Sequence, residues 1–226
     1  TGNFAAVVEG EFYRSAQMRS SGVAHAIRDH KIKTVLNLRG YHPEQAWYRN
    51  ERNATLELGA TQVDMAMSSC EWMSRSQMQT LVDVLQTSER PVLVHCWRGA
   101  ERTGLVSAFV TLLRDGSTLA DAWEQFGARY LFVRLGDGVV MPRHLEQYAI
   151  WLGDERLTHT PDTFRRWVKE GYGPKSPSRE EWPYDPYPLA VFSRPSPSGL
   201  VERKVWDERG RPQAQAEKPH DGVLVR

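Results

Sequence analysis

The chain has 226 residues, with 29 Lys and Arg against 28 Asp and Glu, and this near-neutral charge excludes a nucleic-acid binder that works through bulk positive charge. The hydrophobic fraction of 40% and the charged fraction of 25% are those of an ordinary globular domain. Two cysteines, Cys70 and Cys96, are too few for a disulfide scaffold.

The first three quarters of the chain alternate strands with helices. The pattern predicts two short strands within 5–14 and further strands at 34–38, 61–67 and 91–96. It predicts helices at 20–30, at 44–58, from residue 74 onward, and at 103–114, 118–127, 143–152 and 160–171. The clearest helix start is Ser74 followed by Gln77, a capping box in which each side chain binds the other residue's backbone N–H. This order predicts an α/β fold with a mostly parallel central sheet flanked by helices.

The stretch from His95 to Gly104 carries the chemistry. It joins an apolar strand, typical of burial on both faces, to a helix that is apolar around most of its circumference. Backbone N–H groups of such a loop can converge on one centre with the helix N-terminus behind them, which makes an anion site. Arg102 adds a planar fork for two phosphate oxygens, and Gly99 permits a tight turn. The predicted phosphate-binding residues are Trp97, Arg98, Gly99, Ala100, Glu101 and Arg102.

Cys96 lies at the mouth of that predicted site. The dipoles that bind phosphate also favour a thiolate over a thiol. A thiolate that faces a phosphoryl group can attack it in line and form a phosphocysteine, which water then hydrolyses. Thr103 could offer its hydroxyl to the sulfur when the sulfur becomes the leaving group. His95 is expected to support the loop rather than to act as a base.

The pattern His95-Cys96-x5-Arg102-Thr103 resembles the signature of the cysteine-dependent tyrosine and dual-specificity phosphatases. Upstream, the segments 1–4, 13–17 and 34–40, Trp47-Tyr48 with Glu51, and Val63-Asp64 before Met67-Ser68 are similar to the bacterial dual-specificity-type enzymes. The resemblance covers about residues 1–152 and extends to the helix beyond them. It implies the cysteine-phosphatase fold and a substrate that is a phosphotyrosine or phosphoserine/threonine protein or a phosphoinositide.

Cleavage of a phosphate ester also needs a proton for the leaving oxygen. In the family that the chain resembles, the donor is an Asp roughly thirty residues before the nucleophile. Asp64 lies 32 residues before Cys96 and is therefore the predicted acid. Glu101 is the rival, because some relatives carry an acidic residue next to the loop Arg, here Arg102.

Five further residues are secondary candidates. Arg39 could reach the rim of the pocket, with Asn37 beside it, whereas Arg14 is expected to hold structure. Arg98 could add positive charge for a polyanionic substrate. Cys70 could protect Cys96 through a reversible disulfide, or it could be an unpaired loop cysteine.

Two other functions remain open at this point. A rhodanese-like sulfur transferase also places a Cys at the head of a strand-to-helix loop, although Arg102-Thr103 argues against it. The second alternative is a phosphate-recognition module without catalytic activity, although the presence of both Cys96 and Arg102 argues against it. No His, Cys and Asp cluster has metal-ligand spacing, so neither a metal nor another cofactor is expected.

The tail begins where prolines concentrate, because nine of the 13 follow Gly173. We therefore predict a phosphatase domain over 1–171 and a Pro-rich extended tail over 172–226. The tail is expected to lie against the body up to about Phe192, to form a strand at 200–206 and to be flexible at its end.

No apolar run approaches the roughly 20 residues that a membrane-spanning helix needs, so a soluble domain is expected. The chain opens at Thr1, so we expect that something upstream was removed, and a lost signal peptide or membrane anchor stays open. Cytoplasmic, periplasmic and membrane-associated locations all stay open, as does the oligomeric state.

Overall fold

The computed structural model describes residues 2–134, 139–175, 189–192, 201–206 and 212–217. The strands are β1 (Ala5–Val8), β2 (Phe12–Ala16), β3 (Thr34–Asn37), β4 (Thr61–Met65), β5 (Val92–Cys96), β6 (Leu189–Phe192), β7 (Val201–Trp206) and β8 (Pro212–Glu217). The helices are α1 (Ser20–His30), α2 (Ala46–Glu57), α3 (Arg75–Thr87), α4 (Glu101–Leu112), α5 (Leu119–Trp123), α6 (Val140–Asp154) and α7 (Pro161–Arg166). Short turns of helix lie at η1 (Glu124–Phe126), η2 (Ala128–Tyr130) and η4 (Trp167–Gly171).

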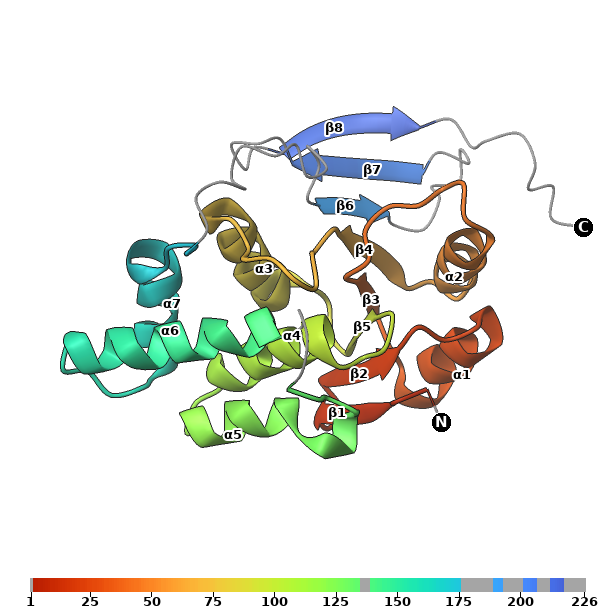
Figure 1. The fold of residues 1–226 in the computed structure, drawn as a ribbon. Coiled ribbons are helices and arrows are strands. Elements are labelled where there is room, and N and C mark those ends of the chain that lie inside the picture. The colour runs from red at the N-terminus through yellow and green to blue at the C-terminus, as the bar shows by residue number, and fades with distance from the viewer. Residues whose placement is uncertain (1, 135–138, 176–188, 193–200, 207–211, 218–226) are drawn as a thin grey trace, which may run out of the picture.

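The strands form one sheet in the order β1-β2-β5-β3-β4-β6-β7-β8 (Figure 1). The central strands β2, β5, β3 and β4 are parallel, and β1, β6, β7 and β8 pair antiparallel at the two sides. This confirms the predicted α/β fold with a parallel core. Because parallel strands end at the same edge, the segments that follow β3, β4 and β5 meet there.

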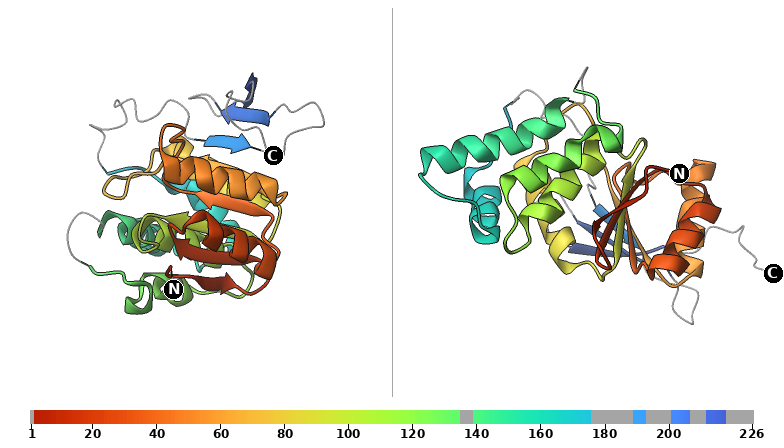
Figure 2. Two further views of the ribbon diagram at one scale, coloured as in Figure 1. Left: turned by 90° about the vertical axis from the view of Figure 1, so that its right-hand side faces the viewer. Right: turned by 90° about the horizontal axis from the view of Figure 1, so that it is seen from below.

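Helices cover both faces of the parallel core. Helices α1 and α2 lie on one face, and α3 to α7 lie on the other (Figures 1 and 2). Alternate residues of β5 belong to different cores, since Leu93 packs in the cluster with Val23 and Ile27, whereas Val94 packs in the cluster with Phe109. Every residue of β5 is buried, as its apolar sequence predicts.

Most predicted elements are confirmed, and the differences lie at helix ends. The capping box of Ser74 and Gln77 starts α3 as expected. Helix α4 begins at Glu101, two residues before its predicted start, so the loop after Cys96 is short. The predicted helix at 118–127 consists of α5 and η1, and the one at 160–171 consists of α7 and a π-helical turn, η4.

The tail contributes strands to the sheet. Strand β6 pairs with β4, which agrees with the expected docking up to Phe192, and β7 confirms the strand predicted at 200–206. Strand β8 pairs with β7, and the flexibility expected at the end of the tail stays a prediction. Residues 176–188, 193–200, 207–211 and 218–226 lie outside the described part of the chain. The boundary after Gly171 stays a prediction, and Tyr172, on its far side, is fully buried in the main core.

His144 of α6 fastens the segment that follows β4. Its ring is buried, and Nδ1 lies within hydrogen-bond distance of the carbonyl oxygens of Val140 and Met141. Nε2 accepts a hydrogen bond from the backbone N–H of Met73 at 3.5 Å. Tyr172 donates its hydroxyl to the Met73 carbonyl at 2.6 Å. Burial lowers the pKa of His144 to about 4, so the ring is neutral near pH 7.

This burial should make the protein less stable in mild acid. Between about pH 6.5 and pH 4 the unfolded chain binds a proton at His144 that the folded chain does not, so the free energy of unfolding falls as pH falls. We expect His144 to account for about 2 kcal/mol of the difference between pH 7 and pH 5. Urea denaturation of His144→Gln at both pH values should show a smaller fall than the wild type. The exposed His25→Gln is the control, and equal falls in all three proteins would contradict this assignment.

Candidate active site

Cys96 ends β5 and opens a short loop that leads into α4. Its side chain is 1% exposed, on the face of the sheet that α4 covers. The backbone N–H of Gly99 points at Cys96 Sγ, with 3.3 Å between nitrogen and sulfur. A donor in this position stabilises negative charge on the sulfur, as the nucleophilic form of a cysteine requires.

Gly99 shapes this loop in a way that no other residue could. Its φ of +71° is in the left-handed region, and an added Cβ would lie 2.6 Å from Ser15 O and Ala16 N of β2. The loop is therefore pressed against the end of β2. The prediction that Gly99 permits a turn is confirmed, and the close approach to β2 is a second reason for glycine.

Asn3 and Arg14 hold the outer side of the loop. Asn3 Nδ2 donates to the carbonyl oxygens of Arg98, Gly99 and Tyr130 at 3.1, 3.2 and 3.0 Å. Arg14 Nη2 donates to Gly99 O at 2.8 Å, and its guanidinium lies 3.7 Å from the centroid of the Tyr130 ring. Arg14 is fully buried, so it supports structure as expected. The role of Asn3 was missed, although Asn3 lies within the N-terminal segment that carries the family resemblance.

Arg102 is anchored at one end of its guanidinium. Nη1 donates to the carbonyl oxygens of Leu38 and Met67 at 3.2 and 3.0 Å, which links α4 to the segments after β3 and β4. Its Nε is buried and has no hydrogen-bond partner among the residues that the structure describes. A buried donor of this kind favours a ligand that accepts hydrogen bonds.

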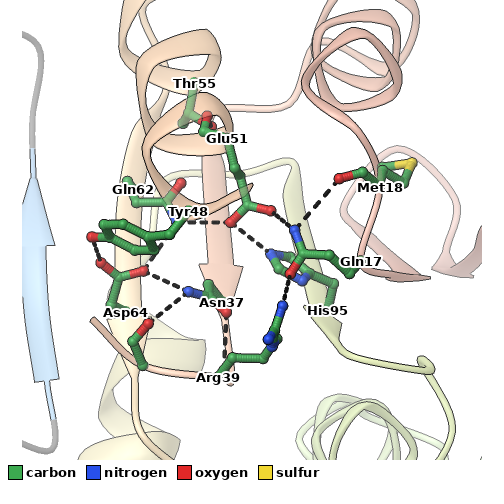
Figure 3. Close-up of polar contacts among 11 residues, drawn as sticks. Gln17, Met18, Asn37, Arg39, Tyr48, Glu51, Thr55, Gln62, Asp64 and His95 are labelled. Atoms are coloured by element: carbon green, nitrogen blue, oxygen red, sulfur yellow. Dashed lines mark hydrogen bonds and ion pairs between the residues drawn. The ribbon is translucent and has the colours of Figure 1, made fainter. Parts of the chain in front are cut away.

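His95 belongs to a different layer from its neighbour Cys96. Its Nε2 lies 3.0 Å from Glu51 Oε1, and both side chains are buried beneath α2 (Figure 3). Gln17 and Gln62 also donate to Glu51. Burial raises the pKa of Glu51, but the charge of His95 and these hydrogen bonds outweigh it and leave the pKa below its usual value. Sequence reasoning missed Glu51 as the partner of His95.

Asp64 lies on that same face of the sheet. Strand register places Asn37 between His95 and Asp64, so these side chains share the α2 side, whereas Cys96 follows His95 and points to the other side. Asp64 accepts hydrogen bonds from Asn37 at 2.9 Å, from Gln62 at 3.0 Å, and from the hydroxyl of Tyr48 (Figure 3).

This placement opposes the predicted acid role of Asp64. The residue is 2% exposed, and burial raises its pKa to about 6 in spite of the hydrogen bonds, which lower it. To reach a leaving group near Cys96 its carboxyl group would have to give up three donors and leave its face of the sheet. Glu101 lies on the loop itself at the first residue of α4 and is half-buried. The acid role of either residue stays a prediction.

Arg39 lies beside the phosphate loop, and its role at the rim of the pocket stays a prediction. Its guanidinium carbon is 3.6 Å from the centroid of the Trp47 ring and 4.7 Å from that of Trp97. Nη1 donates to Gln17 Oε1 at 3.0 Å (Figure 3). Asn37 Oδ1 accepts the backbone N–H of Arg39 at 2.9 Å, so Asn37 shapes the turn that carries this side chain.

The remaining predicted residues are placed as follows. Trp97 and Arg98 are exposed, and the hydroxyl of Thr103 is buried with no hydrogen-bond partner in the described part of the chain. Cys70 and Cys96 are free cysteines, and exposed Cys70 contacts the hydroxyls of Ser68 and Ser69, so the redox link stays a prediction.

The described residues contain no group of three His, Cys, Asp or Glu that could hold a metal ion. None of their helices combines the length and the apolar character that crossing a membrane requires.

Comparison with known proteins places this geometry in a family. The family model described as a DSP-PTPase phosphatase fused to NAD+ kinase matches residues 3–130, more than half of the chain. No curated protein matches the chain at a significant level.

Several solved structures are similar to the chain, and the first one below shares its fold. The core catalytic domain of the PP-IP phosphatase SIW14 from S. cerevisiae is 23% identical, with a TM-score of 0.51, over 70% of this chain and 96% of that one. TpbA from P. aeruginosa is also 23% identical, with a TM-score of 0.43, over 64% and 91%. A protein described as a "putative phosphatase" from Neisseria meningitidis is 17% identical, with a TM-score of 0.47, over 65% of this chain and 98% of that one.

The buried pair of His95 and Glu51 yields a stability prediction. Glu51→Gln removes the negative charge and leaves the imidazole without its ionic partner, so we expect the free energy of unfolding at pH 7 to fall by about 3 kcal/mol. Because the folded-state pKa of Glu51 is depressed, its contribution is present above about pH 4.5 and is lost as pH falls below that value.

Chemical denaturation at pH 7 and pH 4 measures both effects. Glu57→Gln is the control, since Glu57 is exposed on the same helix, and it should change stability by less than about 0.5 kcal/mol. A Glu51→Gln protein as stable as this control at pH 7 would show that the pair contributes nothing.

Proposed function

The chain belongs to the family of DSP-PTPase phosphatases described as fused to NAD+ kinase, and on that premise we propose that it hydrolyses phosphomonoesters through a phosphocysteine intermediate. The observation that carries this proposal is the loop between β5 and α4. There the N–H of Gly99 faces the sulfur of Cys96, and Arg102 keeps a buried N–H without a protein partner among the described residues.

The reaction follows from that arrangement. The Cys96 thiolate attacks phosphorus in line, the S–P bond forms, and the bond between phosphorus and the ester oxygen breaks. A proton passes to the leaving oxygen, which departs as an alcohol or phenol. Water then attacks the phosphocysteine, the S–P bond breaks, and inorganic phosphate and the thiolate are released. Loop N–H groups and Arg102 stabilise the charge that develops on the phosphoryl oxygens.

We propose Glu101 rather than Asp64 as the proton donor. Glu101 starts α4 beside Arg102 and is half-buried, so it can approach a substrate without dismantling a buried network. Asp64 is instead a positioning residue, because it accepts bonds from Asn37 and Tyr48 and thereby fixes the ends of β3 and α2.

The substrate remains one of three classes, namely phosphotyrosine proteins, phosphoserine/threonine proteins and phosphoinositides. SIW14, which has the same fold, is named as a PP-IP phosphatase, and this supports testing small phosphate esters together with phosphopeptides. A turnover panel should therefore hold an aryl phosphate, phosphopeptides and phosphoinositides.

The nucleophile is tested by replacing either cysteine. Cys96→Ser should abolish release of phosphate from p-nitrophenyl phosphate, by at least about 1,000-fold, because a hydroxyl lacks the thiolate. Rapid acid quench of the wild type with labelled substrate should trap phosphate on the peptide that contains Cys96. Cys70→Ser is the matched control and should keep normal turnover. Sulfur transfer from thiosulfate without phosphate release would indicate the sulfur transferase instead.

The proton donor is tested with two esters. Glu101→Gln should slow an alkyl phosphate by about 100-fold or more, yet slow p-nitrophenyl phosphate little, since nitrophenolate leaves without a proton. Asp64→Asn should lower both rates by a similar factor, as expected of a residue that positions the strand ends. A selective loss of the alkyl ester in Asp64→Asn, with Glu101→Gln unaffected, would assign the acid to Asp64.

A further inference from the structure

Arg39 is held rigidly beside the phosphate loop by groups from three different segments. Trp97 belongs to the loop itself, Trp47 belongs to α2, and Gln17 follows β2. The two indole rings lie 3.6 and 4.7 Å from the guanidinium carbon, and Gln17 Oε1 accepts from Nη1. We call Arg39 with Gln17, Trp47 and Trp97 the Arg39 clamp.

We propose that the Arg39 clamp is a second anion site, which binds a second phosphate of the substrate while the loop holds the phosphate to be cleaved. This inference rests on the proposed function, because it assigns the class of substrate to the same site. The ligand is a compact phosphate monoester with another phosphate on a neighbouring carbon.

The charge around the clamp supports an anionic ligand. Burial lowers the pKa of Arg39, and the positive charge of Arg102 lowers it further, so the two guanidinium groups lie close enough to repel each other. Neither of them, nor Arg98, forms an ion pair with a carboxylate among the described residues. The charge of Glu51 acts on Arg39 in the opposite direction and raises the pKa, but Glu51 bonds to Gln17 and His95 rather than to Arg39. A group of cations that lacks ion-paired carboxylates attracts an anion with more than one charge.

The contacts of the Arg39 guanidinium differ from those of an ordinary surface arginine. A guanidinium carries five N–H donors, and the structure assigns one protein acceptor to it, Gln17. Both indole rings lie within cation–π distance of the guanidinium carbon and restrict where the side chain can lie. The side chain is thus ordered before the ligand arrives, which reduces the entropy lost on binding.

The position within the fold places the second anion beside the first. Arg39 follows β3 by two residues, and Cys96 ends β5, the parallel strand next to it. Both therefore lie at the carboxyl edge of the sheet. Arg102 Nη1 also binds the carbonyl of Leu38, the residue that precedes Arg39. A phosphotyrosine carries one phosphate on a ring and offers nothing to this second cation.

Wild-type protein gives the first test. We expect kcat/KM for inositol 4,5-bisphosphate to exceed that for inositol 4-phosphate by at least about tenfold. A molecule with two cleavable phosphates would by itself give a factor of only about two. The preference should shrink as salt rises from 50 to 300 mM, because the added interaction is electrostatic. Equal kcat/KM values would overturn the proposal, whereas no turnover of p-nitrophenyl phosphate would instead overturn the proposed function.

Variants then assign the preference to Arg39. Arg39→Met keeps an unbranched chain between the indoles and removes the charge, so it should lower kcat/KM for the bisphosphate about tenfold more than for the monophosphate. Arg28→Met removes an equal charge from the exposed end of α1 and should leave the ratio of the two substrates unchanged. A ratio in Arg39→Met as large as in the wild type would contradict the assignment.

Binding to a protein that cannot turn over keeps the two proposals apart. In Cys96→Ser, calorimetric titration should give a dissociation constant for inositol 4,5-bisphosphate at least about tenfold below that for inositol 4-phosphate. The double variant with Arg39→Met should lose this difference. Binding of the soluble bisphosphate is then compared with binding to phosphatidylcholine vesicles that contain a lipid with the same headgroup. This comparison distinguishes a free inositol phosphate from a lipid headgroup as the source of the ligand. A preference for tyrosine phosphopeptides over both would overturn the proposal.

Discussion

The close packing of the loop residue Gly99 against the end of β2 is the constraint on which the site depends. No side chain fits between Gly99 and the backbone of Ser15 and Ala16, so the loop is held at backbone distance from the strand. Asn3 and Arg14 bind the loop carbonyl groups from outside. With the carbonyl of Gly99 held by these donors, its N–H is left to face Cys96. An anion site is thereby prepared by the fold before any ligand binds.

The sheet also keeps buried carboxylates away from the sulfur. Because side chains alternate along β5, His95 and Cys96 face opposite layers, and the acids that contact the His95 side, Glu51 and Asp64, stay beneath α2. A carboxylate beside the sulfur would repel both a thiolate and a phosphate dianion. The arrangement keeps both buried acids on the face of the sheet opposite the sulfur, whereas the cations Arg14, Arg39 and Arg102 contact the loop or the segments beside it.

The sequence predicted the fold well because the strand and helix periods are clear, as the apolar run of β5 and the capping box at Ser74 illustrate. It also identified the loop from Cys96 to Arg102. It could not predict which face Asp64 occupies, because spacing along the chain does not specify strand register. Nor could it predict that Glu51 pairs with His95, since residues of α2 and β5 meet only through tertiary packing. The strand at Pro212–Glu217 was missed because Pro, Ala and Glu are uncommon in strands, although apolar and polar residues alternate there.

A single amide connects the buried network to the rim. Gln17 donates through Nε2 to Glu51 and accepts through Oε1 from Arg39. A carboxylate can only accept and a guanidinium can only donate, so these two partners determine the orientation of the amide without ambiguity. An acid at this position would place a second negative charge against Glu51, whereas an apolar residue would remove one of the donors to Glu51 and the side-chain acceptor of Arg39. Glutamine hydrogen-bonds to both charged groups and carries no charge itself. Through Gln17, the buried His95–Glu51 pair helps to fix the position of Arg39 beside the phosphate loop.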